Sequence, residues 1–195
     1  FIKLYDFEGS IVLLEGKRNV LDNDIDKIIA LGSKIAKETK HLNVRSGNAD
    51  GSDYYFCKGF VKFAKSRLEV IVPTKNHRAK YNMASKTYNV GNMNLINEDE
   101  VIYQTKNKKT EAMIDSYLKG EKNRYSVKAP YLIRDTMKVI GHNEIKTCDF
   151  AIFYDDLRKP KQGGTGHTIN ICENNNVPHI NQSVWFNWLW MLKDK

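Results

Sequence analysis

Five short runs of mostly apolar residues are spaced along the chain, and each is typical of a buried β-strand. These runs lie at residues 11–15, 42–46, 68–73, 149–154 and 177–181. Between and after them, apolar residues recur at the three- and four-residue spacing of amphipathic helices. The expected helices cover residues 25–36, 53–65, 131–140, 168–172 and a segment that begins at 183. This alternation predicts a Rossmann-like α/β fold, a three-layer parallel sheet with helices on both faces.

Residues 74–128 interrupt the pattern with weak apolar periodicity. Eleven lysines and arginines face six acidic residues there, so about a quarter of the chain carries +5 of the net charge of +8. We expect a single Rossmann-like domain over residues 1–195, with an inserted basic segment at about 74–128 that includes a helix near 110–118. The insertion is either a lid over the binding edge or a solvated excursion. The charge favours a phosphate-bearing partner, and it equally fits an ordinary lysine-rich surface.

The cysteines and histidines do not form a ligand pattern. The three cysteines, none in a Cys-x-x-Cys pair, are Cys57, Cys148 and Cys172. We therefore expect neither a disulfide framework nor a structural zinc site, and His77, His142 and His179 are too dispersed to bind another metal. No cofactor is expected. Free thiols, the lack of a run of about 18 apolar residues and a start unlike a signal peptide predict a cytoplasmic protein.

Three unusual loops each follow a predicted strand, and ligands gather at the carboxyl ends of strands in open parallel sheets. The first loop contains a glycine and two basic residues, and its candidate ligand-binding residues are Gly16, Lys17, Arg18 and Asn19. Glycine permits a tight turn, and the basic side chains donate charge-assisted hydrogen bonds to phosphate. The same residues also fit a plain strand-to-helix turn.

The second loop opens a predicted helix, whose N-terminus favours an anion. Its candidate ligand-binding residues are Arg45, Ser46, Gly47, Ala49, Asp50 and Asp53. Asp53 lies in the first helical turn, so it either caps the helix or accepts a hydrogen bond from a ribose hydroxyl.

The third loop contains successive glycines, whose N–H groups form a nest for phosphate. Its candidate ligand-binding residues are Gly163, Gly164, Thr165, Gly166, His167 and Thr168. The spacing matches neither the P-loop of ATPases nor the G-x-G-x-x-G of dinucleotide dehydrogenases. His167 fits a base, a hydrogen-bond partner or a solvent-facing side chain.

Two other groups carry weaker signals. Arg134 and Asp135 fit an ion pair at the beginning of a helix. The last helix carries several large apolar side chains, namely Trp185, Trp188, Leu189, Trp190 and Leu192. Core packing and a dimer surface explain the tryptophans better than stacking on a base does.

The order of the motifs resembles the SLOG superfamily, the Rossmann-like group that includes DprA and the LOG/lysine decarboxylase-like nucleotide proteins. Residues 45–53 are similar to the S-G-x-A-x-G-x-D turn of DprA-like proteins. Residues 134–141 and 149–153 resemble the R-N-x-x-Q-x-x-G segment and the following strand of small DprA-like proteins common in phage genomes. Residues 163–166, followed by 177–181 with Asn181, are similar to their ending. The resemblance covers about residues 11–73 and 129–181.

The resemblance implies a nucleotide or nucleotide-sugar pocket that includes Arg134 and Asn181, and it implies a dimer, because family members often pair. LOG-type phosphoribohydrolases use a catalytic glutamate. That position is Asn170 here, and Glu173 lies three residues further on. An amide cannot act as a general base, so we assign no catalytic residue.

Three functions remain open. The first is a protein that senses or sequesters an ADP-ribose-like or cyclic nucleotide signal without turnover, as in defence and anti-defence signalling. The second is a nucleotide N-glycosidase or phosphoribohydrolase-type enzyme, whose acid and base would come from Asp50, Asp53, His167 or Glu173. The third is a DprA-like protein that binds single-stranded DNA, for which the basic insertion is the motive.

Overall fold

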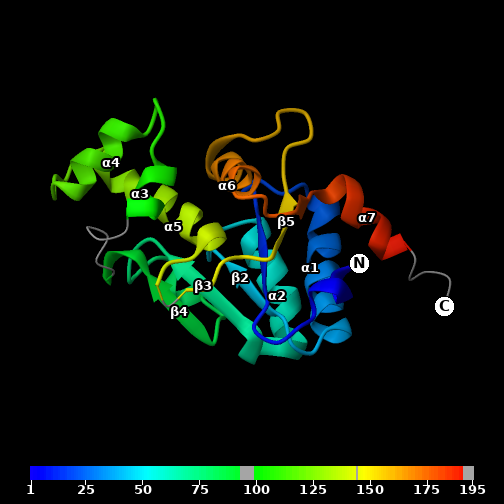
Figure 1. Cartoon of the computed structure of the whole chain (residues 1–195). Helices are drawn as coiled ribbons and strands as arrows, with labels where there is room; N and C mark the ends of the chain where they lie inside the picture. Colours follow the sequence, from blue (N-terminus) through cyan, green and yellow to red (C-terminus); the bar gives the residue numbers. More distant parts are fainter. Residues whose placement is uncertain (93–98, 144, 191–195) are drawn as a thin grey trace.

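The computed structural model describes residues 1–92, 99–143 and 145–190. Its strands form an all-parallel sheet in the order β4-β3-β2-β1-β5-β6 (Figure 1). The strands are β1 (Ile11–Gly16), β2 (Asn43–Ser46), β3 (Leu68–Val72), β4 (Lys86–Asn89), β5 (Phe150–Tyr154) and β6 (His179–Ile180). The chain builds outward from β1 to β4 and then returns past β1 to add β5 and β6. The order therefore reverses between β1 and β5, the place where such sheets bind ligands.

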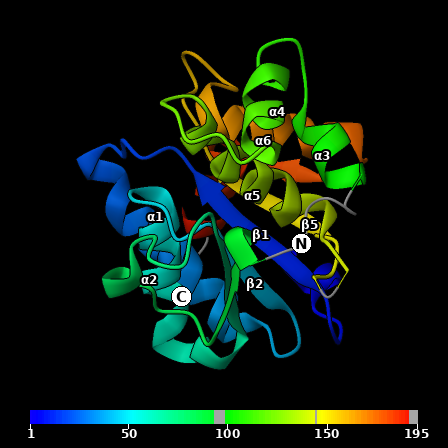
Figure 2. The ribbon, with the colours of Figure 1, turned by 90° about the vertical axis from the view of Figure 1, so that its left-hand side faces the viewer.

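Helices cover both faces of the sheet, which confirms the expected fold class (Figure 2). One face carries α1 (Asp22–Glu38), α2 (Ser52–Ala64) and α7 (Gln182–Trp190). The other face carries α3 (Asp99–Thr105), α4 (Glu111–Leu118), α5 (Ala129–Ile140) and α6 (Gly163–Asn174). Short 3-10 turns lie at Ile2–Tyr5, Lys65–Arg67, Ala79–Tyr81, Val90–Asn92 and Ser126–Lys128.

The alternation of side chains along the strands explains why both faces are covered. Val12 and Leu14 of β1 pack beneath α1 and α2, whereas Leu13 packs on the opposite face with α5 and α6. All three are fully buried. Successive strand residues point to opposite faces, and each buried aliphatic side chain contributes about 1.5–3 kcal/mol to stability. Glu15 follows Leu13 on the same face, so β1 delivers a carboxylate under α5 and α6.

The last helix packs against the core. Trp185 is fully buried, and its indole N–H donates to the carbonyl of Phe153 at 2.9 Å. Its ring meets Phe56 of α2 edge-on, with 5.9 Å between centroids. The expected packing of Trp185 in the core is confirmed. Leu192 and the side chain of Trp190 lie outside the described residues.

The segment at 74–128 contributes to the sheet as well as to its cover. β4 pairs in parallel with β3, from Glu69 opposite Lys86 to Val72 opposite Asn89. The sequence pattern did not predict β4, because it is a four-residue edge strand whose first two side chains are exposed and polar. The helix expected near 110–118 is α4, while α3 was not predicted. Both helices pack on α5 through the apolar cluster that includes Val101, Ile114 and Ile133.

Two hydrogen-bonded links fasten α3 to its neighbours. The side-chain amides of Gln104 in α3 and Asn175 after α6 bond each other in both directions. The hydroxyl of Thr105 donates to that of Thr136 in α5 at 2.8 Å. The end of α3 is therefore held against α5 and α6 rather than extended into solvent. No helix in the described ranges is long and apolar enough to cross a membrane.

Candidate functional site

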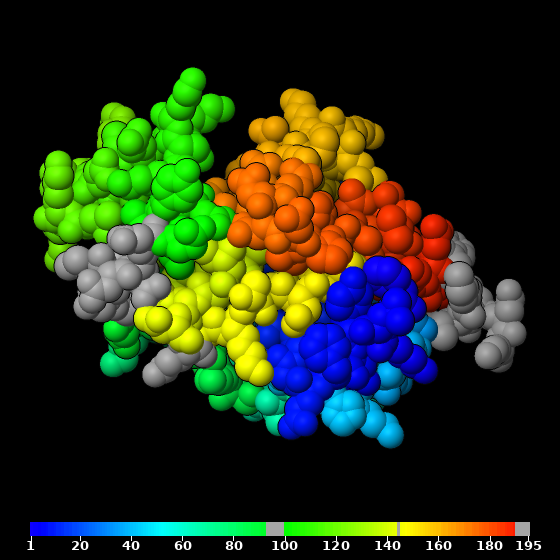
Figure 3. Space-filling model, viewed as in Figure 1, coloured from blue at the N-terminus to red at the C-terminus, as the bar shows by residue number. Residues whose placement is uncertain are grey.

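A cavity of about 940 Å³ opens at the carboxyl edge of the sheet, above the reversal between β1 and β5. Its walls come from the loops after β1 and β2, from α5 and from the beginning of α6. The segment at 107–113 between α3 and α4 closes the outer side. In Figure 3 the opening is the notch between the green α3–α4 region and the orange segment that leads into α6. The volume lies near the upper end of the range for small-molecule sites, roughly 300–1,000 Å³.

The N-terminus of α6 points into this cavity. The glycine-rich run was expected as a loop before a helix, but the structure begins α6 at Gly163, so the run forms the first turns of the helix itself. The N–H of Gly166 bonds to Gln162, and the N–H groups before it have no acceptor within the helix. A Cβ on Gly166 would lie 2.0 Å from the carbonyl oxygen of Lys161, so only glycine fits there. The helix end thus offers backbone donors and a partial positive charge to an anion.

Six basic side chains line the cavity against three carboxylates, so its field favours anions. The basic residues are Lys17, Arg18, Lys109, Lys128, Arg134 and Lys161. Lys17 pairs with Asp156 at 2.9 Å, and Lys161 pairs with Glu173 at 2.6 Å. Within the described ranges, Arg18, Lys109 and Lys128 make no ion pair. We exclude the buried Arg134 and call the other five side chains the basic rim, namely Lys17, Arg18, Lys109, Lys128 and Lys161.

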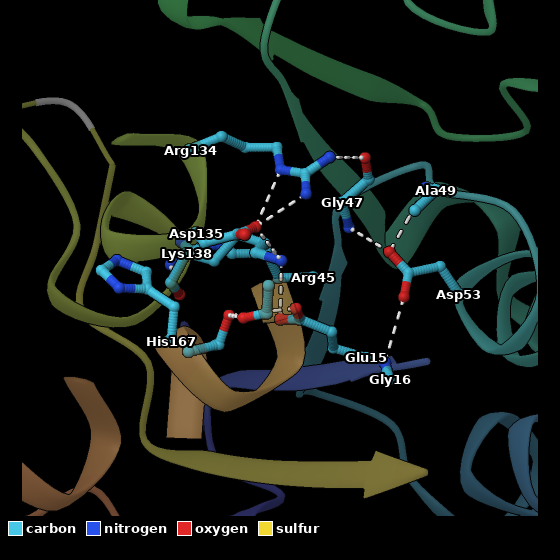
Figure 4. A network of polar contacts seen from close by, with 12 residues as sticks. Glu15, Gly16, Arg45, Gly47, Ala49, Asp53, Arg134, Asp135, Lys138 and His167 are labelled. Atoms are coloured by element: carbon cyan, nitrogen blue, oxygen red, sulfur yellow. Dashed lines mark hydrogen bonds and ion pairs between the residues drawn. The ribbon is translucent and has the colours of Figure 1, made fainter. Parts of the chain in front are cut away.

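A buried ionic network lies directly beneath the cavity, and we define it as Glu15, Arg134, Asp135, Lys138 and Thr168 (Figure 4). The Lys138 ammonium, fully buried, lies 2.6 Å from Glu15 Oε2 and 2.8 Å from Asp135 Oδ1. Arg134 donates to the same Asp135 oxygen from Nε and Nη2, at 3.0 and 2.7 Å. Thr168 donates to Glu15 Oε1 at 3.0 Å. The network joins β1, α5 and α6 under the ligand position.

The pKa values of the two carboxyl groups in this network are shifted in opposite directions. Burial raises the pKa of Glu15 to about 7, and the nearby carboxylates Asp135 and Asp53 add to the increase, while Lys138 opposes it. Burial also raises the pKa of Asp135, but Arg134 and Lys138 together hold it below its ordinary value. Asp135 is therefore the permanent anion of the network, and Glu15 is the member that takes up a proton near neutral pH.

Asp53 is a loop anchor. Its two oxygens accept hydrogen bonds from the backbone N–H groups of Gly16 (3.2 Å), Gly47 (3.1 Å) and Ala49 (3.3 Å). The carboxylate thereby fixes the loops after β1 and β2 beside each other, as Figure 4 shows. The donors lie outside α2, so Asp53 joins two loops and does not cap its own helix. Asp53 is 1 % exposed, which suits an anchor.

The cavity brings together most of the residues predicted to bind a ligand. These are Gly16, Lys17, Arg18, Ala49, Asp53, Arg134, Gly163, Gly164, Thr165, Gly166 and His167. All three predicted loops contribute to it, because their strands are parallel and end at one edge. Arg134 lies in the middle of α5 and does not begin that helix. Its predicted ion pair with Asp135 is present.

Several other predicted residues do not line the cavity, and four of them are buried beneath it. Arg45 is fully buried, where it pairs with Glu69 at 2.7 Å and donates to the carbonyl of Lys138 at 2.9 Å. Ser46 is buried in β2, and Gly47 lies behind Arg134, to which its carbonyl is bonded. Thr168 faces the network. These residues support the site from below, and the expectation that they contact a ligand is not met by the geometry.

The remaining predicted residues lie elsewhere on the surface. Asn19 is exposed beyond the rim. Asp50 is exposed and pairs with Arg78 at 3.2 Å. Asn181 accepts from the backbone N–H of Ser183 and so positions the start of α7. None of the three lines the cavity.

His167 is a hydrogen-bond partner, one of its three expected roles. Its Nε2 lies 2.9 Å from the hydroxyl of Thr136. Burial lowers its pKa, so the ring is neutral at pH 7. The ring also lines the cavity, beside Asn170 at the position where LOG-type enzymes carry glutamate. Glu173 is engaged with Lys161 outside the cavity.

Sequence reasoning missed a second set of cavity residues on the α4–α5 side. Met113, Tyr131 and Leu132 give the cavity an apolar wall, while Lys109 and Lys128 add charge opposite α6. Glu15, Asp135 and Lys138 were also missed as a buried network. A carboxylate within a buried strand and a lysine three residues after an aspartate are weak signals, and only the fold shows that they meet.

Comparison with known proteins adds a likeness of fold. No protein-family model matches the sequence, and no curated protein matches it. Among solved structures, the chain is similar to DNA processing protein A from Helicobacter pylori, a protein with a single-stranded DNA binding mode. The identity is 14 %, the TM-score is 0.48, and the match covers 92 % of this chain and 67 % of that one. The predicted relationship to the SLOG superfamily stays a prediction.

Fold and site together define a class: a Rossmann-like α/β protein with a basic cavity at the topological switch point. Within that class, three features distinguish this chain: a glycine-rich helix end, a buried ionic network below it and an α3–α4 wall beside it.

Proposed function

We propose that the cavity binds a nucleotide-derived ligand through its phosphate groups. The observation that carries the proposal is the N-terminus of α6, which opens among six basic side chains at the reversal of strand order. Backbone N–H groups at a helix end and unpaired cations both favour phosphate, and here they face the same space. Gly163 and Gly164 carry no side chain that would keep a phosphate from the backbone.

The α4–α5 wall supports a nucleoside next to the phosphate. Tyr131, Leu132 and Met113 are half-buried and line the cavity across from α6. Aromatic and thioether groups pack well against a flat base, whereas the polar floor does not. The cavity therefore has a phosphate side and an apolar side, as expected for a site that takes both parts of a nucleotide.

The engagement of the carboxylates favours holding the ligand over cleaving it. Glu15 and Asp135 are ion-paired to Lys138, and Asp53 accepts hydrogen bonds from three backbone N–H groups. Asn170 offers an amide in place of a general base. We therefore place a sensing or sequestering protein ahead of a nucleotide hydrolase.

Mass spectrometry of small molecules released from the purified protein tests the proposal. The protein is incubated with nucleoside phosphates, cyclic nucleotides and ADP-ribose and then denatured. We expect one unchanged compound at about one per chain. Lys128→Glu should weaken its binding at least about tenfold, because a phosphate contact is replaced by repulsion. Lys122→Glu is the matched control, since Lys122 is exposed in the same segment but outside the cavity.

Each contrary result has its own meaning. Accumulated cleavage products would make the protein an enzyme and refute holding without turnover. If no compound of the panel is retained, or if Lys128→Glu and Lys122→Glu act alike, the cavity is not the nucleotide site.

A second candidate is single-stranded nucleic acid, and a specific feature favours it. A further hollow of about 560 Å³ shares Asn107 with the main cavity and continues along α3. The exposed ring of Tyr103 lines it together with two lysines, Lys106 and Lys108, and two glutamates, Glu100 and Glu111. Basic groups beside an exposed aromatic ring suit a strand whose bases stack on side chains.

Fluorescence anisotropy with a labelled oligothymidylate separates this candidate from a free nucleotide. Strand binding should weaken steeply between 50 and 200 mM salt, the range in which counterion release is usually measured. Tyr103→Ala should reduce it by about tenfold, the value of roughly one stacked base. Affinity that ignores both salt and Tyr103 would exclude the strand.

A further inference from the structure

Three arginines from three different elements converge beside the cavity, on the side away from α6. Arg18 follows β1, Arg78 follows β3 and Arg134 lies in α5. Arg18, Arg134 and Tyr131 line the cavity. The Tyr131 ring lies 5.7 Å from the Arg134 guanidinium and meets the ring of His77 edge-on at 5.5 Å. Arg78 is the next residue after His77. The loop after β3 thus brings a third guanidinium to the cavity margin.

The loop is held in a backbone conformation that is unusual for an arginine. Arg78 has φ +46°, and Asn48, at φ +53°, donates from its side-chain amide to the carbonyls of His77 and Arg78 at 3.1 and 3.4 Å. Left-handed conformations of non-glycine residues are strained, and they concentrate at functional sites. The Arg78 guanidinium is further oriented by the ring of Tyr81, 4.7 Å away. The side chain is therefore positioned and not simply solvated.

Two of the three guanidinium groups pair with a carboxylate, and within the described ranges the third does not. Asp135 pairs with Arg134, and the largely exposed Asp50 pairs with Arg78, but Arg18 has no ion pair among the described residues. Burial, followed by the charges of Arg134, Arg78 and Arg18, lowers the pKa of His77 to about 4, so all three cations lie within electrostatic reach of one ring. In the described part of the chain, Arg78 Nε and His77 Nε2 are buried without a hydrogen-bond partner. Buried polar groups without a partner are uncommon in folded proteins, and the Arg78 Nε–H can donate to an anion.

We propose that Arg18, Arg78 and Arg134 form a second anion-binding subsite, and that this subsite takes a second phosphate group of the same ligand. The inference rests on the proposed binding of a nucleotide phosphate at the N-terminus of α6. Guanidinium groups present planar pairs of donors to phosphate oxygens, and three of them at one point recognise a dianion better than a sugar or a base does. Tyr131 of the apolar wall contacts both His77 and the Arg134 guanidinium, so a base packed on it would lie next to this subsite.

This arrangement selects a ligand class. A nucleoside held against Tyr131 can present one phosphate to α6 and another to the arginines when it carries phosphates on different positions of the sugar. A nucleoside 3′,5′-bisphosphate has this pattern, and so does a nucleotide within a short strand. A 5′-monophosphate fills only one of the two positions.

Isothermal titration calorimetry with matched ligands tests the subsite. The probes are the 5′-monophosphates and the 3′,5′-bisphosphates of adenosine, guanosine, cytidine and uridine, and the dinucleotides of the same bases with a 5′-phosphate. For the best base, the bisphosphate should bind at least about tenfold more tightly than the monophosphate, because of the added charge-assisted contacts. A dinucleotide tighter than the bisphosphate assigns the second phosphate to a strand, and the reverse order assigns it to a free ligand.

Arg78→Gln should reduce the preference for bisphosphate to within about twofold of unity and leave monophosphate binding unchanged. Arg124→Gln is the matched control. Arg124 also stacks on a neighbouring tyrosine, Tyr125, at 4.7 Å, but lies outside the cavity, so its loss should leave the preference intact. Arg78→Lys should restore part of the preference, which shows that the charge is needed and that the loop still folds.

The outcomes separate the two proposals. If monophosphate and bisphosphate bind equally to the unaltered protein, or if Arg78→Gln and Arg124→Gln have the same effect, the subsite is refuted while nucleotide binding stands. If none of the nucleotides binds, the proposed function fails and the subsite fails with it.

Discussion

The buried ionic network lies beneath the cavity and the basic rim lines it, yet their charges are arranged in opposite ways. In the network, Lys138 is fully buried between two carboxylates. On the rim, Lys109 and Lys128 are exposed and make no ion pair among the described residues. Paired and buried charges hold elements together, because losing one partner leaves the other uncompensated. Unpaired and exposed charges remain available to a ligand. The same residue type therefore serves the fold in one region and, in the proposed function, recognition in the other.

Removing the buried ammonium is the strongest way to break this contrast. Lys138→Met should lower the free energy of unfolding by about 3–5 kcal/mol, because Glu15 and Asp135 lose their shared cation. Lys128→Met should change it by less than about 0.5 kcal/mol. Urea unfolding of both variants measures the difference. Equal effects would show that the network contributes no more to the fold than the rim does.

The proton uptake of Glu15 gives the next largest effect. Its pKa is about 7 in the folded chain against an ordinary 4.5, so the folded state binds more protons in this interval, and the contribution of Glu15 to stability falls as pH rises from 4.5 to 7. The change corresponds to about 3 kcal/mol. His77 and His167, whose pKa values are lowered, give the opposite slope below pH 6.5. Their contributions cancel when Glu15→Gln is compared with the unaltered chain.

Unfolding free energies of both proteins at several pH values provide the measurement. The stability of the unaltered protein minus that of Glu15→Gln should fall steadily between pH 4.5 and 7. A difference that stays flat, or rises, would show that the Glu15 carboxyl is ionised throughout this range.

A smaller effect is expected from the loop anchor. Asp53→Asn should cost about 2 kcal/mol, because an amide oxygen and an NH₂ group cannot accept the three backbone N–H bonds that the carboxylate accepts. Asp50→Asn is the control, since Asp50 lies in the same loop and is exposed. Thermal unfolding compares the two. If they melt alike, the loops after β1 and β2 are held by other contacts.

The smallest expected change in stability is on the rim, where binding responds instead. Lys109→Ala should leave the free energy of unfolding within about 0.5 kcal/mol and weaken phosphate binding, with the loss shrinking as salt is added. Calorimetry at two salt concentrations, together with urea unfolding, checks both parts. A large loss of stability would place Lys109 with the network.

The sequence was informative where local pattern decides structure. Apolar runs located five of the strands, and the loops after β1, β2 and β5 could be assigned to one edge because parallel strands end together. β4 was missed because Lys86 and Thr87 face solvent and show no apolar pattern. Glycines at 163–166 indicated an anion site, but helical spacing alone could not show that the helix begins at Gly163.

The candidate site was less predictable than the fold, for a physical reason. Whether an arginine is exposed or buried depends on partners distant in sequence. Arg45 was assigned to a ligand, yet it is buried and bonds Glu69 and the Lys138 carbonyl inside the core. Lys138 meets Glu15 only because β1 and α5 are brought together by the crossover. Tyr131 and Lys128 reach the cavity because α5 lies over the sheet.

The links between α3 and α6 affect the entropy of binding. Gln104 bonds Asn175 at one end of α6, and Thr105 reaches His167 at the other end through Thr136. These bonds thus fix the positions of the outer wall and of α6 relative to each other before a ligand binds. A site shaped in advance loses little conformational freedom when it is filled, so more of each contact appears as affinity. If the cavity binds a nucleotide as proposed, these hydrogen bonds would raise its affinity without touching it.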